Sequence, residues 1–320
     1  MKEFCTQTAH ALAQERGAVV QEAGAVAHEK GLDRPTPLKN AGKSLNISPG
    51  ISANISQGIS ASISPKISET AVAERFSKAA PRYDKLAAIQ RTIAQQGLQN
   101  LPAQLVGNAL DIGCGTGVHT ESLNACGLHA VGVDIAQGML ALAGTNYPHL
   151  TFKLGSAQAL PIASRSIDVV FSSMALQWAN CLHSVAEEVH RVLKRDAIAE
   201  MAIMVSGSFE ELTLARKLAQ LPEAITPLPT AGSWNRAFRD AGLAVKRVIT
   251  RDYVDSHRDI MSLLRSVKGV GAGETGKQQK VLSRQDIKKL SMAYHNIIHG
   301  EAGCLPLTYR VCHFRLEKNA

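Results

Sequence analysis

The segment that most constrains the fold is Ala109–Val118, with the sequence ALDIGCGTGV. A short apolar run reaches an acidic residue, Asp111, and three glycines follow at alternate positions, Gly113, Gly115 and Gly117. Glycine allows the positive φ angles of a tight turn and lets a ligand lie against the main chain. The pattern predicts a buried strand, a glycine turn and then a helix. Such a unit forms the nucleotide pocket at the carboxyl end of the first strand of an open α/β sheet.

The spacing of the glycines separates two kinds of cofactor. The dinucleotide fingerprint needs glycine or alanine at the sixth position, and counting from Gly113 that position holds Val118. The run D-x-G-x-G-x-G instead resembles motif I of the class I S-adenosylmethionine methyltransferases. The next expected strand, His129–Ile135, carries Asp134 at its end, about twenty residues past the glycines, where a carboxylate can accept hydrogen bonds from ribose hydroxyls. We therefore expect S-adenosylmethionine as cofactor, with S-adenosylhomocysteine as product.

Composition and cysteine usage restrict the class of protein. Hydrophobic residues make up 45% of the 320 residues, enough for a sizeable core, and no apolar run is long enough for a membrane span. The first residues lack the apolar segment of a signal peptide. The six cysteines show no CxxC spacing, which favours reduced thiols in a cytoplasmic protein without a metal site. Within the glycine turn, we interpret Cys114 as a small residue and not as a nucleophile.

The positive charge is concentrated near the end of the chain. Residues 243–320 hold 14 basic and 7 acidic side chains, which accounts for +7 of the net charge of +8. Such a surface suggests an acidic partner, either a nucleic acid, a phosphate-bearing ligand or an acidic protein. A solvated lysine-rich face is an equally good interpretation of the charge alone. No Pro-Pro-Tyr-like segment of the nucleic-acid amino methyltransferases follows the expected fourth strand, so we expect no nucleic-acid substrate.

Residues 1–70 differ in composition from the rest. The dipeptide Ile-Ser recurs six times at an interval of four between residues 47 and 68. Prolines and glycines interrupt any helix that this interval could form. We expect a low-complexity, disordered tail.

Residues 71–320 are expected to form one catalytic domain with lid insertions near 206–230 and 255–300. The predicted fold is α/β and Rossmann-like, a mostly parallel seven-stranded sheet with helices on both faces and a helical lid. After the glycine turn, strands are expected at 129–135, 149–154, 167–173, 198–205, 243–253 and 307–316, the last antiparallel in the sheet interior. The expected later helices span 184–193, 234–241, 257–267 and 284–298.

The segment Phe76–Asp84 should bring a side chain to the pocket. Pro81 is expected to end one short helix and to open another. The second helix would carry Tyr83 to the pocket mouth, although ordinary helix packing explains this tyrosine equally well.

Two positions depart from the pattern of the methyltransferase class. Many members carry an acidic residue after the third strand to meet the adenine amino group, where this chain has Ser156, followed by Ala157 and Gln158. The usual Pro-Gly-Gly turn before the fifth strand is replaced by Lys194–Ala197, which should affect local geometry only. The candidate cofactor-binding residues are Asp111, Gly113, Cys114, Gly115, Gly117, Asp134, Ile135, Ser156, Ala157, Gln158 and Ser173.

Several segments together resemble one family, the malonyl-acyl-carrier-protein O-methyltransferases of biotin synthesis. They cover most of residues 72–316 and are FSKAAPRYD at 76–84, LAAIQR at 86–91, SSMALQW at 172–178, MVSGSFEEL at 204–212, SLLRSVKGVGA at 262–272, VLSRQDIKKL at 281–290 and PLTYRV at 306–311.

The resemblance implies methyl transfer to the free carboxylate of a malonyl group on acyl-carrier protein or coenzyme A. This carboxylate is already ionised at neutral pH, so no general base is needed. The candidate substrate-positioning residues are Tyr83, Arg265 and Lys268, the last two for the acceptor carboxylate or the phosphopantetheine phosphate. Docking of an acidic surface, or plain solvation, explains these two cations equally well. The acyl-carrier protein would dock on the basic C-terminal lid. Two alternatives stay open: a methyltransferase of a quinone-type small metabolite, and a non-catalytic cofactor-binding assembly factor or sensor.

Overall fold

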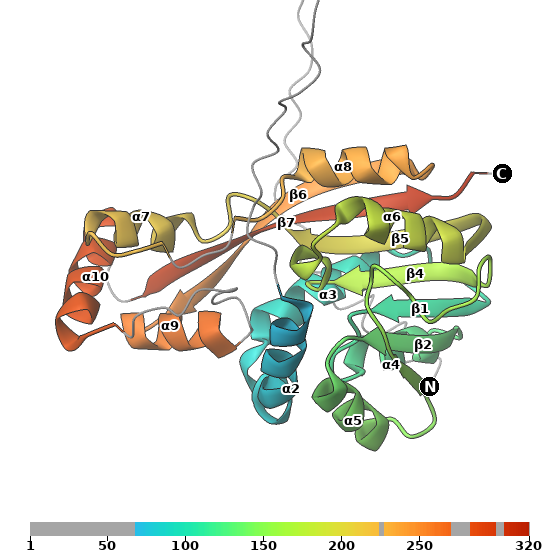
Figure 1. Ribbon diagram of the computed structural model, residues 1–320, viewed down its shortest axis with the longest axis horizontal. Helices are drawn as coiled ribbons and strands as arrows, with labels where there is room; N and C mark the ends of the chain where they lie inside the picture. Colours follow the sequence, from blue (N-terminus) through green and yellow to red (C-terminus); the bar gives the residue numbers. More distant parts are fainter. Residues whose placement is uncertain (1–67, 224–226, 270–281, 299–303, 320) are drawn as a thin grey trace, which may run out of the picture. The chain divides into compact units, whose positions relative to one another are not determined.

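The computed structural model describes residues 68–223, 227–269, 282–298 and 304–319 (Figure 1). Of the predicted tail, residues 1–70, residues 1–67 lie outside the described residues. No helix in the described ranges is both long and apolar enough to cross a membrane.

The central feature is a seven-stranded sheet with the strand order β3-β2-β1-β4-β5-β7-β6. The first five strands pair in parallel, and β7 is antiparallel to both neighbours. The predicted fold and the interior antiparallel last strand are therefore confirmed. The strands are β1 Asn108–Ile112, β2 His129–Asp134, β3 Thr151–Leu154, β4 Ile167–Ser173, β5 Leu193–Met204, β6 Ala244–His257 and β7 Leu305–Glu317.

The helices agree with the predicted ones in position along the chain. The helix predicted after the glycine turn begins at Val118, and the later predicted helices are present with shifts of a few residues at their ends. They are α2 Glu69–Leu86, α3 Ala88–Asn100, α4 Val118–Ala125, α5 Gln137–Asn146, α6 Leu182–Val192, α7 Glu210–Leu218, α8 Ala231–Asp240, α9 Ile260–Gly269 and α10 Arg284–Ile297, with a 3₁₀ turn at Leu176–Trp178.

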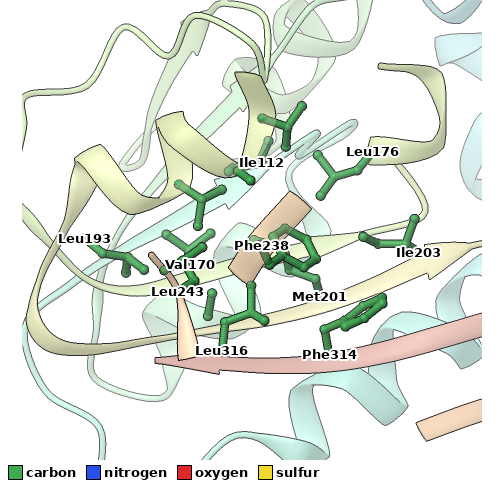
Figure 2. Close-up of a cluster of buried hydrophobic side chains, with 14 of the residues drawn as sticks. Ile112, Val170, Leu176, Leu193, Met201, Ile203, Phe238, Leu243, Phe314 and Leu316 are labelled. Atoms are coloured by element: carbon green, nitrogen blue, oxygen red, sulfur yellow. The ribbon is translucent and has the colours of Figure 1, made fainter. Parts of the chain in front are cut away.

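Alternating side chains of the sheet form cores on its two faces. Val170 belongs to the core covered by α6 and α8 (Figure 2). In this core the ring centroids of Phe238 and Phe314 are 5.3 Å apart. Val169 and Phe171, the neighbours of Val170 in β4, pack on the opposite face with side chains of α3 and α4. Successive strand residues point to opposite faces, so the apolar run of β4 supplies both cores. The continuous apolar run Val169–Phe171 is thus explained by burial on both sides.

A further core forms where α7, α9 and α10 gather at one end of the long strands β6 and β7 (Figure 1). Leu263 of α9 and Tyr294 of α10 are fully buried there, and the rings of Phe209 and Tyr309 meet edge to face at 4.7 Å. These three helices, which we call the helical addition, lie within the segments predicted as lid insertions.

Pro81 does not break the helix, which corrects the prediction. Helix α2 runs through Pro81 to Leu86, and the chain turns at Ala87. A proline inside a helix removes one backbone hydrogen bond and costs roughly 3 kcal/mol. Contacts with the rest of the fold help to hold the helix in place. One turn before Pro81, for example, Ser77 Oγ accepts a hydrogen bond from the backbone N of Gly138 in α5.

The segment that replaces the Pro-Gly-Gly turn forms an irregular start of β5. Asp196 adopts a left-handed conformation with φ 61°, and the pairing with β4 shifts register here. Lys318 holds this bend, since its O accepts from the N of Asp196 at 2.7 Å and its N donates to Ala197 O at 3.0 Å. The strain of a left-handed non-glycine residue, about 1 kcal/mol, is confined to this bend.

Candidate active site

A cavity lies at the carboxyl ends of β1, β2 and β4, on the side where the strand order reverses, and α2 also contributes to its wall. Such a switch point is where open α/β sheets bind their ligands. Eight predicted site residues line this cavity, Tyr83, Gly113, Gly115, Asp134, Ile135, Ser156, Ala157 and Ser173. The sheet topology therefore brings together residues from five separate segments.

The three glycines of the turn all have positive φ, but for different structural reasons. A Cβ on Gly113 would lie 2.1 Å from the Cβ of Ala175, whereas one on Gly115 would meet no atom of the described residues within 4 Å. Gly117 caps the start of α4 with φ 85° and does not line the cavity. The backbone N atoms of Gly113 and Cys114 both donate to Val133 O, which ties the turn to β2. The turn is thus a packed and hydrogen-bonded wall of the cavity.

Asp111 and Cys114 are buried side chains in and next to the glycine turn. Thr120 Oγ1 donates to the buried carboxyl of Asp111 at 2.7 Å, and burial raises the pKa of this carboxyl to about 7. Burial also raises the pKa of the Cys114 thiol. Since only a thiolate is a strong nucleophile, the geometry agrees with Cys114 as a small packing residue.

Asp134 joins the end of β2 to the glycine turn. Its Oδ2 accepts from the backbone N of Gly115 at 2.9 Å, and its Oδ1 accepts from the N of Ala136 at 2.8 Å. Burial raises the pKa of this carboxyl, while the backbone donors oppose the shift. The carboxyl group is therefore fixed at the cavity wall with further acceptor capacity on both oxygens.

Aromatic side chains form another part of the wall. The ring of Phe76 packs edge to face on Tyr83 and on Trp178, with centroid distances of 6.2 Å and 6.1 Å. All three residues line the cavity. Burial raises the pKa of the Tyr83 hydroxyl, so it stays protonated. This cluster forms an aromatic wall on one side of the cavity.

A second hollow adjoins the first and shares Tyr83, Gly113, Gly115 and Ser173 with it. Its wall is polar, with Asp84, Gln90, Arg91, Thr116 and His119. Within the described residues, Ser173 Oγ and the buried Gln90 Oε1 have no hydrogen-bond partner. Burial lowers the pKa of His119 to about 4, so its imidazole is neutral at pH 7. The arrangement suits the polar end of an elongated ligand.

The remaining candidate residues lie away from the cavity wall. Gln158 anchors neighbouring segments, because its Oε1 accepts from the N of Cys181 at 2.7 Å and its Nε2 donates to Glu69. Arg265 and Lys268 are exposed on α9 and line neither hollow. Helix α9 contacts α2, which carries Tyr83. Their role toward an acceptor stays a prediction.

Sequence reasoning missed several residues of the wall. Glu69, Val72 and Phe76 reach the cavity from α2, and Met139 reaches it from α5. The first three follow a helical spacing of three and four residues, which places them on one face of α2. That spacing is visible in the sequence, but the position of α2 over the strand ends is not.

The sequence of this chain is similar to that of known proteins. Residues 110–200 match the family described as "Methyltransferase domain". The chain is 30% identical over 255 residues to the malonyl-[acyl-carrier protein] O-methyltransferase of Dechloromonas aromatica (strain RCB), covering 78% of this chain and 95% of that protein. It is 33% identical over 259 residues to the biotin biosynthesis bifunctional protein BioHC of Cellvibrio japonicus (strain Ueda107), covering 79% of this chain and 51% of that protein. The chain thus spans about half the length of this bifunctional relative.

Two solved structures share the fold. The YcgJ protein of Bacillus subtilis is 15% identical, with a TM-score of 0.51, covering 72% of this chain and 99% of that one. The second is a chain from the complex between the Haloferax volcanii Trm112 methyltransferase activator and a methyltransferase. It is 19% identical, with a TM-score of 0.51, and the match covers 78% of this chain and 98% of that one.

The sheet order, the glycine turn and the matched domain define a class I S-adenosylmethionine-dependent methyltransferase. Within this class, the 30% identity over 95% and 94% of the length of two curated relatives is decisive. The chain belongs to the malonyl-[acyl-carrier protein] O-methyltransferase family.

The residues present fit the cofactor of this class. Asp134 would hold the ribose, and the glycine turn would let the cofactor lie against the main chain. Ser173 Oγ and Gln90 Oε1 have no hydrogen-bond partner in the described part of the chain. Together with Arg91 and Asp84, they would meet the charged amino-acid end of the molecule in the second hollow.

Replacing Asp134 with alanine should weaken cofactor binding. The variant loses the ribose acceptor and the bond that fixes Gly115, so we expect the Kd of S-adenosylhomocysteine to rise roughly 10- to 100-fold. Isothermal titration calorimetry measures this change. Asp168→Ala is the matched control, because Asp168 accepts from Asn108 N at the opposite end of the sheet and should leave the Kd unchanged. Unchanged affinity in Asp134→Ala would contradict the placement of the ribose.

Proposed function

We propose that this enzyme methylates the free carboxylate of a malonyl group carried by acyl-carrier protein, as an early step of biotin synthesis. One observation carries the proposal. The identity with the Dechloromonas aromatica enzyme extends over 255 residues, far beyond the matched domain at 110–200. It therefore includes much of the chain outside the cofactor domain, where acceptor recognition is expected to lie.

The chain's own residues supply binding and orientation. When bound, S-adenosylmethionine supplies an electrophilic methyl group. The malonyl carboxylate is already ionised at neutral pH, so no residue has to remove a proton from it. Tyr83 keeps its proton and can donate a hydrogen bond toward the acceptor, while Phe76 and Trp178 exclude water. Holding reactants in a productive orientation can be worth roughly 7–11 kcal/mol.

The proposed partner is an acyl-carrier protein bound on the basic part of the helical addition. Arg265 and Lys268 of α9 and Lys288 and Lys289 of α10 are exposed. Such side chains would be complementary to an acidic protein or to the phosphopantetheine phosphate. A cytoplasmic location, favoured by the scattered cysteine spacing of the sequence, belongs to the same proposal.

Methyl transfer to malonyl-acyl-carrier protein is the test of the proposed reaction. With labelled S-adenosylmethionine, we expect label on the malonyl form and none on the acetyl form, which lacks the carboxylate. Release of the label as volatile methanol on treatment with base would identify a methyl ester, since cleavage of the thioester alone leaves the label on the acyl group. Cofactor binding without label on either form would contradict the proposal and favour a small-metabolite enzyme or a sensor.

The role of the exposed cations is tested by Arg265→Ala and Lys268→Ala. Each should raise the KM for malonyl-acyl-carrier protein about tenfold, because a charge-assisted contact is lost, and leave the Kd of S-adenosylhomocysteine unchanged. Lys246→Ala is the control, since Lys246 pairs with Glu317 on the sheet. An equal loss with malonyl-coenzyme A would indicate contact with the shared malonyl-phosphopantetheine arm. An unchanged KM with both substrates would exclude these side chains.

A further inference from the structure

An acidic side chain from α2 meets the loop that follows β3. Glu69, the first residue of α2, lines the cavity together with Ser156 and Ala157. Ser156 Oγ donates to Glu69 Oε1 at 3.1 Å, and Gln158 Nε2 donates to the same oxygen. Two donors therefore fix the carboxyl group, and neither of these bonds uses its second oxygen, Oε2.

The loop itself supplies no acidic residue. Its sequence, GSAQALP at 155–161, has Ser156 where many methyltransferases of this class carry the acid that meets the adenine amino group. Among the described residues that line the cavity, the acidic ones are Glu69 and Asp134. Asp134 lies at the end of β2, where its carboxyl is hydrogen-bonded to Gly115 and Ala136 and suits the ribose.

The neighbours of Glu69 on α2 also face the cavity. Val72 and Phe76, three and seven residues further along, line it as well. Residues at this spacing share one helix face. The first turn of α2 thus presents Glu69 and Val72 together, an acceptor beside an apolar surface, as an adenine ring requires.

We propose that Glu69 binds the exocyclic amino group of the cofactor's adenine and supplies from α2 the acidic acceptor that the loop lacks. The amino group is a donor and an ionised carboxylate only accepts, so the contact favours adenine over a base with an oxygen at this position. The proposal rests on S-adenosylmethionine as cofactor. Glu69 is a binding residue in this role and takes no part in methyl transfer.

Calorimetric titration with two ligands tests the proposal without an activity measurement. S-adenosylhomocysteine has the amino group, and S-inosylhomocysteine has a carbonyl oxygen in its place. The wild-type protein should prefer the first. In Glu69→Gln the side-chain amide can donate to the carbonyl oxygen, so we expect the preference to fall about tenfold. Glu74→Gln, an exposed position on the same helix, should keep the wild-type preference.

A second substitution separates recognition from a structural role. Adding Ser156→Asp to Glu69→Gln returns an acid to the loop and should restore the preference for S-adenosylhomocysteine. An equal loss of both ligands in Glu69→Gln, or an unchanged ratio, would overturn the proposal and leave Glu69 as an anchor of α2. Absence of S-adenosylhomocysteine binding in the wild type would instead overturn the cofactor assignment, and the Glu69 proposal with it.

Discussion

Gly113→Ala is expected to weaken S-adenosylhomocysteine binding at least 100-fold while the rest of the fold is retained. The new Cβ would lie 2.1 Å from Ala175 Cβ, and φ at this position is +74°. The methyl group therefore meets a steric clash and a strained backbone together. Relief requires the turn to move away from the exit of β4, and the cavity wall moves with it. Calorimetry for binding and circular dichroism for the fold measure the two consequences.

Other glycines of the chain separate clash from backbone strain. Gly127 has φ +93° and nothing within 4 Å of an added Cβ, so Gly127→Ala reports strain alone, away from the cavity. Gly144, inside α5, has neither strain nor clash, and Gly144→Ala should be neutral or slightly stabilising. Both should bind S-adenosylhomocysteine like the wild type. Normal binding by Gly113→Ala would show that the turn adapts and does not form a fixed cavity wall.

Glu200→Ala should lower the free energy of unfolding by about 3–5 kcal/mol, the usual cost of breaking a buried ion pair. The Glu200 side chain is fully buried, at 0% exposure, and accepts from Arg315 Nε at 2.7 Å, Arg247 Nη2 at 3.2 Å and Asn100 Nδ2 at 2.8 Å. The two arginines pair in register across β7 and β6, and Arg315 lies opposite Glu200 of β5. Removing the carboxylate leaves Arg315, itself 15% exposed, without its ion-pair partner.

Urea unfolding measures this loss, and two further variants define its origin. Arg258→Ala removes an ion pair with Asp259 whose side chains are 80% and 47% exposed, and it should change stability by less than about 1 kcal/mol. Glu200→Leu combined with Arg315→Met removes the carboxylate and the more buried of its two arginines. It should recover much of the loss, because the remaining arginine, Arg247, is 37% exposed and can be solvated. A loss below about 1 kcal/mol in Glu200→Ala would mean that water reaches the arginines.

The order of the elements and the core of the cofactor site could be predicted because their signals are local. A strand followed by Gly113, Gly115 and Gly117 needs no distant contact to indicate a turn against which a ligand lies. The acidic end of the next strand, Asp134, follows at a fixed distance because parallel strands end at one edge of the sheet.

The sequence by itself therefore determined the strand–turn–helix unit, the acidic end of the next strand and the class of cofactor, all of which depend on neighbours in the chain. Only the tertiary structure decided that α2 continues through Pro81, that Glu69 meets Ser156 across 87 residues, and that Arg265 and Lys268 lie outside the cavity wall. The physical reason is that a helix end or a side-chain contact is set by the surface on which the helix packs. The burial gained by that packing outweighs local preferences such as the cost of an internal proline.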